Sequence, residues 1–368
     1  MEIFEYLKRS TLQLPITFKG SNYIEETQRF FASFQNDIKL TNDLDEQYRL
    51  TAGDLQKVRT LQENLVGVIQ HFFNGDSYRA YGLLRETMKT VEGELGNFSF
   101  VQKPGSWKFF DKLFRVRTAT ETLKSRADIF HVPFSKRRQV QSYRFSVPGL
   151  PALYFGSSMY ICWEEMGRPS LEDLYAAKFR LSETETISSL NLSMTPLMLS
   201  ELFKEIPVDS PDADLKSAFA KAFKSMLILW PLIASCHVSV LRPELYFKPE
   251  YIIPQLVMQF VSSENDFESI VYYSTKVNAQ RIHPSRCLNF VFPAKNNITS
   301  LEFAPSLSVK VQCTEPLSIR LFLASISAGF GTAVPPDFAV AEGVDVNYSV
   351  TDFGRIESAL AKMSFASV

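Results

Sequence analysis

The feature that most constrains the fold of this chain is a change of hydrophobic period near residue 100. In residues 43–75 apolar side chains recur at threes and fours with charges on the other face, and Gly75 is suited to end a helix. Beyond residue 100, short runs rich in Phe, Val, Tyr and Leu are separated by Gly and Pro. We therefore predict an α+β fold that begins with a helical region, not regularly alternating βαβ units.

The runs beyond residue 100 define the strands and helices that we expect. Strands are predicted at 112–118, 141–147, 152–158, 175–181, 269–275 and 288–293. Helices are predicted at 195–206, 213–237 and 252–263, and a last helix at 355–363. The tail beyond residue 310 has no chemical signature, so its role does not follow from its residues.

The longest apolar stretch is residues 226–241. It is shorter than the roughly 20 residues that span a bilayer, and Pro231 interrupts it, so we predict a buried helix.

The first twenty residues lack the basic segment, apolar core and cleavage site of a signal peptide. The four cysteines are scattered without a CxxC pair, which predicts neither a zinc site nor a disulfide framework and favours a reducing cytoplasm.

Composition and missing motifs exclude several classes of function. The 39 basic and 40 acidic residues nearly balance, which argues against a dedicated nucleic-acid or membrane-surface protein. The sequence has no GxxxxGK[ST] loop, GxSxG elbow, HExxH motif or GxGxxG loop after a strand. None of the four histidines sits at metal-ligand spacing, so no metal is expected. We interpret His131 as a packing or turn residue and Cys162 as an inert core thiol.

Two adjacent carboxylates, Glu164 and Glu165, end the aromatic and nearly uncharged run YRFSVPGLPALYFGSSMYICWEE. A carboxylate in such surroundings is costly unless a partner pairs with it, so we expect the chemistry of the chain here. A purely structural alternative is that Glu165 begins a helix and pairs with Arg168.

Arginine, tyrosine, glutamate and serine residues follow one another in a recognisable order around these carboxylates. The positions are Arg115 in FRVR (Arg117 is the competing choice), Arg144 in SYRFSVPG, Tyr154, Glu165 eleven residues later, Ser274 in SIVYYSTK and Asn289 in LNFVFP. This ordered set resembles the RES domain, a family named for arginine, glutamate and serine that occurs in toxins of bacterial toxin–antitoxin systems. The resemblance covers residues 108–295. The chain departs from the family where Ser142 and Tyr143 replace a common Gly-Gly, and where Ser146 replaces a common asparagine.

The resemblance implies a fold like that of ADP-ribosyltransferases, with a mixed, largely antiparallel sheet and helical insertions. It divides the chain into a helical N-terminal domain (1–105), a RES catalytic domain (106–310) and a C-terminal extension (311–368) that packs on the catalytic domain. It implies NAD as the substrate, cleavage of the nicotinamide–ribose bond by hydrolysis or phosphorolysis, and an antitoxin or other regulatory protein as a partner. Neither a nucleic acid nor a membrane is expected as a partner.

The resemblance assigns catalytic roles to Glu165, Arg115 and Ser274, and substrate binding to Arg144, Tyr154, Arg117 and Ser146. These residue types suit the chemistry. Cleavage of the nicotinamide–ribose bond develops an oxocarbenium ion, which a carboxylate stabilises electrostatically. Arginines are planar, permanently charged donors that suit a diphosphate, and a tyrosine ring can stack on a flat base.

Three other functions stay open. The same fold supports transfer of ADP-ribose to a protein, and a scaffold of this kind can also serve as a non-catalytic interaction module. A nuclease is the weakest alternative, because the helical N-terminal region has no Arg-x4–6-His pair. Release of nicotinamide from NAD separates an enzyme from an interaction module.

Overall fold

The structure is a computed structural model that describes residues 2–102, 112–182, 184–204, 213–264, 266–277, 282–295, 301–325, 338–341 and 344–368. The chain divides into two compact units. The helical unit comprises Met1–Phe100, Ser142–Val147 and Leu190–Asn265, and the sheet unit comprises Val101–Gln141, Pro148–Ser189 and Asp266–Val368. The predicted α+β class is confirmed.

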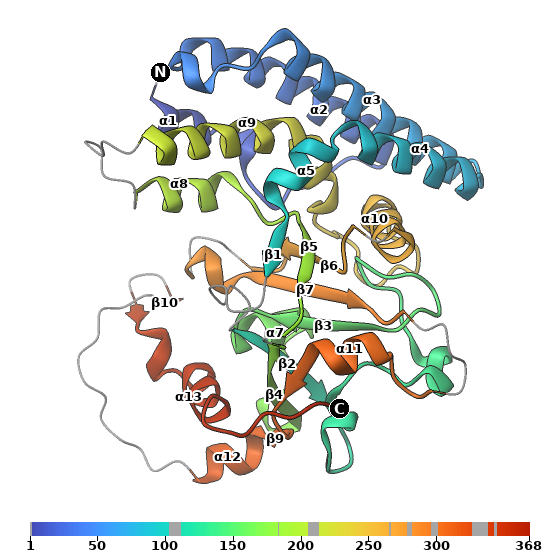
Figure 1. The fold of residues 1–368 in the computed structure, drawn as a ribbon, viewed down its shortest axis with the longest axis vertical. Helices are drawn as coiled ribbons and strands as arrows, with labels where there is room; N and C mark the ends of the chain where they lie inside the picture. Colours follow the sequence, from blue (N-terminus) through green and yellow to red (C-terminus); the bar gives the residue numbers. More distant parts are fainter. Residues whose placement is uncertain are drawn as a thin grey trace. The chain divides into compact units, whose positions relative to one another are not determined.

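The helical unit contains the helices that the apolar periodicity predicts before residue 100, together with three later helices (Figure 1). The helices are α1 (Ile3–Leu7), α2 (Tyr23–Lys39), α3 (Ala52–Phe73), α4 (Ser77–Thr90), α5 (Glu92–Phe98), α8 (Pro196–Lys204), α9 (Ala213–Cys236) and α10 (Ile252–Ser263), with 3-10 turns at Ser10–Leu12, Leu40–Asp43, Glu46–Tyr48 and Pro249–Tyr251.

Local sequence signals set the limits of α3. The Thr51 hydroxyl accepts from the Asp54 backbone N–H while the Asp54 carboxylate accepts from the Thr51 N–H, a reciprocal cap that starts the helix. The helix ends at Phe73, just before Gly75 with φ of 78°. The predicted stop at Gly75 therefore lies close to the observed end.

Residues 226–236 of the apolar stretch form the second half of α9 and are buried as predicted, whereas the stretch leaves the helix after Cys236 and ends at the exposed Leu241. Trp230 at its centre is fully buried and donates its indole N–H to the carbonyl of Thr11 at 2.8 Å. Among the described residues, Asp214–Cys236 is the helix long and apolar enough to cross a membrane, and 83% of its most apolar window is buried within the protein. Burial of this kind is typical of a core helix.

The sheet unit contains most of the strands. They are β1 (Phe100–Gln102), β2 (Leu113–Thr118), β3 (Ala152–Gly156), β4 (Leu174–Leu181), β5 (Ile187–Asn191), β6 (Ser269–Tyr273), β7 (Leu288–Pro293), β8 (Val311–Cys313), β9 (Leu317–Ser318), β10 (Phe338–Ala341) and β11 (Val344–Val346). The helices of this unit are α6 (Arg126–Ile129), α7 (Met159–Glu165), α11 (Pro305–Lys310), α12 (Ile319–Ser325) and α13 (Asp352–Leu360), with 3-10 turns at Phe134–Gln139, Leu171–Asp173, Pro284–Arg286 and Tyr348–Val350.

The main sheet has the strand order β1-β5-β6-β7-β3-β2-β4-β8, with β9 beside β4, and β10 pairs separately with β11. The pairs β6–β7, β7–β3, β3–β2, β2–β4 and β4–β8 are antiparallel. Strand β2 pairs with β4 along its full length, whereas it is in register with β3 at Phe114 and Gly156.

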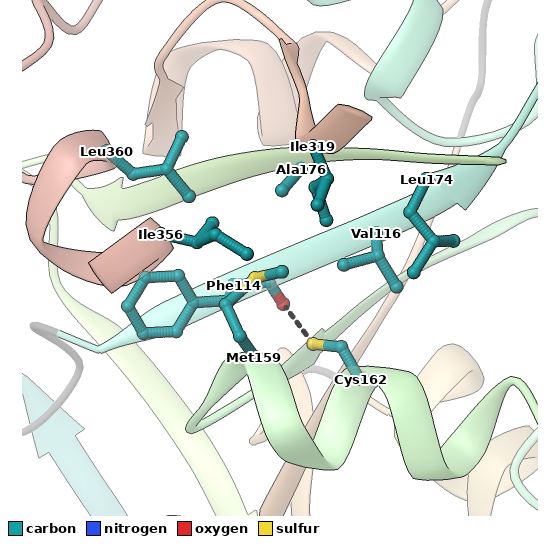
Figure 2. Close-up of a cluster of buried hydrophobic side chains, with 9 residues drawn as sticks. All are labelled: Phe114, Val116, Met159, Cys162, Leu174, Ala176, Ile319, Ile356 and Leu360. Atoms are coloured by element: carbon teal, nitrogen blue, oxygen red, sulfur yellow. Dashed lines mark hydrogen bonds between the residues drawn. The ribbon is translucent and has the colours of Figure 1, made fainter. Parts of the chain in front are cut away.

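A cluster of buried side chains holds α7 and α13 against one face of β2 and β4 (Figure 2). It consists of Phe114, Val116, Met159, Cys162, Leu174, Ala176, Ile319, Ile356 and Leu360. Cys162 donates its thiol hydrogen to the Phe114 carbonyl at 3.2 Å. This cluster fixes the helix that carries the two adjacent carboxylates.

The predicted strand at 141–147 is wrong, because this segment forms turns. The Ser146 hydroxyl bonds both the N–H and the carbonyl of Tyr143, a local arrangement that competes with strand pairing. Pro148 follows, which has no N–H to donate, and Gly149 has φ of 76°. The predicted strands at 112–118, 152–158, 175–181, 269–275 and 288–293 are present as β2, β3, β4, β6 and β7.

The contact-defined units differ from the linear segments 1–105, 106–310 and 311–368, since residues 142–147 and 190–265 belong with the N-terminal helices. The reason lies in α9, whose apolar surface packs on α3 and α5. Part of the predicted segment 106–310 therefore completes the helical core.

Candidate active site

A tight strand-to-helix connection presents the two carboxylates. Strand β3 ends at Gly156, and α7 begins after Ser158, whose hydroxyl accepts from the Ile161 N–H at 3.2 Å. A Cβ atom on Gly156 would lie 2.8 Å from the Cys162 sulfur, so the close approach of α7 to β3 requires glycine. The eleven-residue interval between Tyr154 and Glu165 is therefore the end of β3, a two-residue turn and the whole of α7.

Helix α7 ends directly after the two glutamates, and the two side chains have different partners. The Gly167 N–H donates to the Glu164 carbonyl and the Arg168 N–H to the Trp163 carbonyl, and Gly167 and Arg168 have φ of 81° and 60°. These bonds form a C-terminal cap that stops the helix directly after Glu165.

The Glu164 side chain is buried and paired within the protein. This side chain is 4% exposed and accepts from the Arg168 guanidinium at 2.8 Å. Burial, together with a hydrogen bond to Glu164, raises the pKa of the Tyr160 hydroxyl. The structural alternative suggested by the sequence thus applies to Glu164: Arg168 pairs with this residue, and Glu165 lies at the end of the helix, not at its beginning.

Glu165 lies where three separate segments of the chain meet. Its Oε1 accepts hydrogen bonds from the Ser274 hydroxyl at 2.6 Å and from the Asn289 amide at 2.7 Å. Ser274 and Asn289 are buried, and the Glu165 side chain is 30% exposed. A carboxylate held through one oxygen and open to solvent is oriented without being enclosed.

The register of the sheet explains this meeting. Asn289 of β7 lies opposite Tyr272 of β6 and opposite Gly156 of β3, so all three point to the sheet face that α7 covers. Ser274 follows two residues after Tyr272, and its N–H donates to the Cys287 carbonyl at 2.9 Å. Strand alternation therefore brings Ser274 and Asn289 to the same side, under the end of α7.

Lys276 completes the immediate surroundings of Glu165. Its ammonium donates to the Glu165 backbone carbonyl and lies 3.6 Å from Oε2, beyond hydrogen-bonding distance. Lys276 is not among the residues that the resemblance singles out, although it stands in SIVYYSTK two residues after Ser274.

Arg115 and Tyr154 lie on the neighbouring strands β2 and β3. The Arg115 guanidinium donates to the Tyr154 carbonyl at 3.1 Å, which bridges the two strands. Alternation along β2 puts Arg115 on the sheet face opposite to Phe114, which packs against α7. Arg117, the competing choice, is exposed and donates to the Asp128 carbonyl.

Arg144 and Ser146 belong to the helical unit. The Arg144 side chain is buried and donates to the carbonyls of Cys236 at 3.1 Å and Val238 at 2.9 Å, at the end of α9. Its guanidinium also lies 5.2 Å from the centre of the Tyr251 ring. This geometry gives Arg144 a structural task at a helix end. The predicted substrate-binding roles of Arg144 and Ser146 stay predictions.

His131 and Cys162 have the surroundings of core residues. The His131 Nε2 accepts from the Ala304 N–H at 3.0 Å, and Nδ1 donates to the Val132 carbonyl at 2.8 Å. Burial lowers the pKa of His131 to about 4, so the ring is neutral. Burial raises the pKa of the Cys162 thiol to about 12, which disfavours the reactive thiolate. Within the described residues, no group of three or more His, Cys, Asp and Glu side chains is arranged to hold a metal ion.

A curated protein of Bacillus subtilis (strain 168), described as "Putative toxin YopC", is similar to this chain. The two are 29% identical over 336 residues, which cover 88% of this chain and 73% of the relative. No family model matches the chain. No solved structure matches it.

Proposed function

We propose that this protein is an NAD-consuming enzyme that cleaves the bond between nicotinamide and ribose, and that it acts as a toxin. The observation that carries the proposal is the convergence of Ser274 and Asn289 on Glu165. The glutamate and serine that the RES resemblance pairs are 109 residues apart in sequence and share a hydrogen bond. If Glu165 served only as a helix-end residue paired with a surface arginine, hydrogen bonds from Ser274 and Asn289 would not be needed.

The geometry suits stabilisation of a developing cation. Because Ser274 and Asn289 both bond Oε1, the carboxylate of Glu165 is held in one orientation, with Oε2 free of a direct hydrogen bond from either residue. In the proposed reaction, Oε2 accepts from a ribose hydroxyl and stabilises the oxocarbenium ion as neutral nicotinamide departs. The oxygen of a water molecule then bonds to the ribose carbon and loses a proton to solvent, or an anionic phosphate oxygen bonds there with no proton to lose.

Two of the other predicted residues take supporting roles in the proposal. Tyr154 would stack on a flat ring of NAD, and Ser274 acts through Glu165 by orienting its carboxylate. The diphosphate-binding roles of Arg115 and Arg117 stay predictions, since Arg115 lies on the sheet face opposite to α7 and Glu165. Arg144 and Ser146 belong to the helical unit, and their predicted substrate-binding roles are not part of this proposal.

The toxin part of the proposal is supported by the B. subtilis relative, whose description names a toxin. An enzyme that drains NAD deprives a cell of a central redox carrier, which gives such a toxin its effect. A location in the cytoplasm and an antitoxin or other regulatory protein as a partner belong to the same proposal.

Nicotinamide release from NAD tests the proposal. Purified protein would be incubated with NAD in three arms: buffer alone, added inorganic phosphate, and added cell lysate. ADP-ribose, a phosphorylated ADP-ribose or labelled protein would identify water, phosphate or protein as the acceptor, and labelled protein would favour an ADP-ribosyltransferase. Absence of nicotinamide in all three arms, from folded protein, would contradict the proposal and favour an interaction module.

A further inference from the structure

A carboxylate from the far end of the sequence contacts the beginning of α7. Glu357 of α13 accepts hydrogen bonds at Oε1 from the Met159 N–H and from the Tyr348 hydroxyl, both at 2.7 Å. Its side chain is 13% exposed. The first N–H groups of a helix have no partner within the helix, so Glu357 satisfies one of those at the start of α7.

Tyr348 and Arg286 extend this contact. The Tyr348 hydroxyl accepts from the Tyr160 N–H at 3.3 Å, and the Arg286 guanidinium lies 4.2 Å from the centre of the Tyr348 ring. Arg286 Nη1 is 3.8 Å from Glu357 Oε2. Two successive N–H groups of α7, at Met159 and Tyr160, thus bond side chains from the C-terminal tail.

The same cluster is tied to the strand that carries Asn289. The Arg286 carbonyl accepts from the Ser158 hydroxyl at 2.8 Å, and the Ser157 hydroxyl accepts from the Leu288 N–H at 2.9 Å. The turn before α7 and the beginning of β7 are therefore joined directly. Both ends of the Glu165–Asn289 hydrogen bond depend on this junction.

Helix α7 is too short to fix its own orientation. It has seven residues, and a helix of that length has marginal stability without tertiary contacts. Apolar packing comes from Ile356 and Leu360 of α13, which lie in one cluster with Met159 and Cys162 (Figure 2). Glu165 is the last residue of this helix, so a shift at Met159 moves the carboxylate.

We propose that Glu357, supported by Tyr348 and Arg286, is a positioning residue that holds α7 so that Glu165 reaches Ser274 and Asn289. The C-terminal tail is then a part of the active site and not an appendage to it. This proposal rests on the proposed function for its catalytic consequence, while the positioning of α7 is independent of the reaction.

Three variants and one control test the proposal on the full-length chain. Glu357→Ala removes Oε1, the acceptor of both hydrogen bonds. Glu357→Gln keeps an oxygen at the position of Oε1, and Tyr348→Phe removes the partner of the Tyr160 N–H. Glu121→Gln is the control, since Glu121 is an exposed carboxylate in the same unit. The measurements are kcat and KM for nicotinamide release, and hydrogen–deuterium exchange of the peptide that spans residues 157–166.

The proposal predicts that Glu357→Ala lowers kcat by roughly tenfold to a hundredfold with little change in KM, because misplacement of a reacting group costs rate more than binding. Exchange at Met159 and Tyr160 should become faster, Glu357→Gln should restore most of kcat, and Tyr348→Phe should lie between. Glu357→Ala with wild-type kcat and exchange would overturn the proposal, and so would an equal loss in Glu357→Gln.

If the wild type releases no nicotinamide, exchange alone decides: faster exchange in Glu357→Ala supports the positioning role, and equal exchange refutes it. If Glu357→Ala does not fold, Tyr348→Phe is judged by the same two measurements.

Discussion

The Ser274 hydroxyl donates to the carboxylate of Glu165 at 2.6 Å, although the two residues are separated by 109 positions in the sequence. Asn289 donates to the same oxygen at 2.7 Å. Hydrogen bonds to a charged acceptor are stronger than neutral ones, so this pair of donors holds the carboxylate in one orientation.

Ser274→Ala and Asn289→Ala should each lower kcat for nicotinamide release, because each removes a donor that orients Glu165. A hydrogen bond to a charged group contributes about 1.5 to 3 kcal/mol. Since both donors bond the same oxygen, their effects should not add in the double variant. A double-mutant cycle of kcat would show this coupling. Strictly additive losses would show that the two residues act independently of each other, which would contradict a shared role at one oxygen of Glu165.

Arg144→Ala should lower the stability of the protein more than its affinity for NAD. The variant leaves the carbonyls of Cys236 and Val238 without their charged donor, and an unsatisfied buried group costs about 1 to 3 kcal/mol. Thermal unfolding and calorimetry with NAD would be compared with Arg137→Ala, which changes an exposed arginine. A loss of NAD affinity at unchanged stability would instead support the diphosphate role that the resemblance assigns to Arg144.

The neutral ring of His131 should make stability depend on pH. Its pKa is lowered by burial to about 4 from 6.5, so the unfolded chain binds more protons than the folded one between these values. The contribution of the neutral ring is complete above the unfolded pKa and is lost as the pH falls toward the folded pKa. Between about pH 6.5 and 5 the loss amounts to about 2 kcal/mol.

Urea unfolding of the wild type and of His131→Gln would check this pH dependence. The free energy of unfolding of the wild type should fall more steeply with acidification than that of the variant, which keeps an acceptor but does not titrate. Parallel curves for the two proteins would show that His131 titrates normally.

Expression of the chain without a partner should slow growth by draining NAD. The prediction follows from the proposed reaction and from the toxin description of the B. subtilis relative. Intracellular NAD would be measured after induction of the wild type and of Glu165→Gln. Equal NAD in the two cultures, with both proteins soluble, would favour a non-catalytic scaffold.

Much of the site followed from the order of residues in the sequence. Tyr154 lies on β3 and Ser274 directly follows β6, strands whose apolar, aromatic residues are a strong local signal, and β3, β6 and β7 occur where expected. Strand register decides which residues contact one another in the candidate site, and the strand propensity of each segment does not determine that register. The choice between Glu164 and Glu165 depended on the eleven-residue interval, and the structure gives its physical basis in the cap at Gly167.

Other features could not be predicted because their determinants are distant in the sequence. The segment around Arg144 has a strand-like composition, yet the Ser146 hydroxyl and the carbonyls at the end of α9 decide its conformation. Glu357 lies in a tail without a recognisable motif, and its contact with Met159 becomes visible only when α13 is packed on α7. Lys276 reaches Glu165 through its long side chain, a contact that spacing alone does not reveal.

The most direct test of the central claim is nicotinamide release from NAD by the matched pair Glu164→Gln and Glu165→Gln. The two substitutions change adjacent carboxylates in the same way, so they separate the role of charge at one position from a general effect on α7. Folding of both variants would be verified by circular dichroism. We predict that Glu165→Gln loses activity equivalent to about 3 kcal/mol or more, roughly a hundredfold in kcat, whereas folded Glu164→Gln keeps most of its activity. Wild-type activity in folded Glu165→Gln would contradict the account.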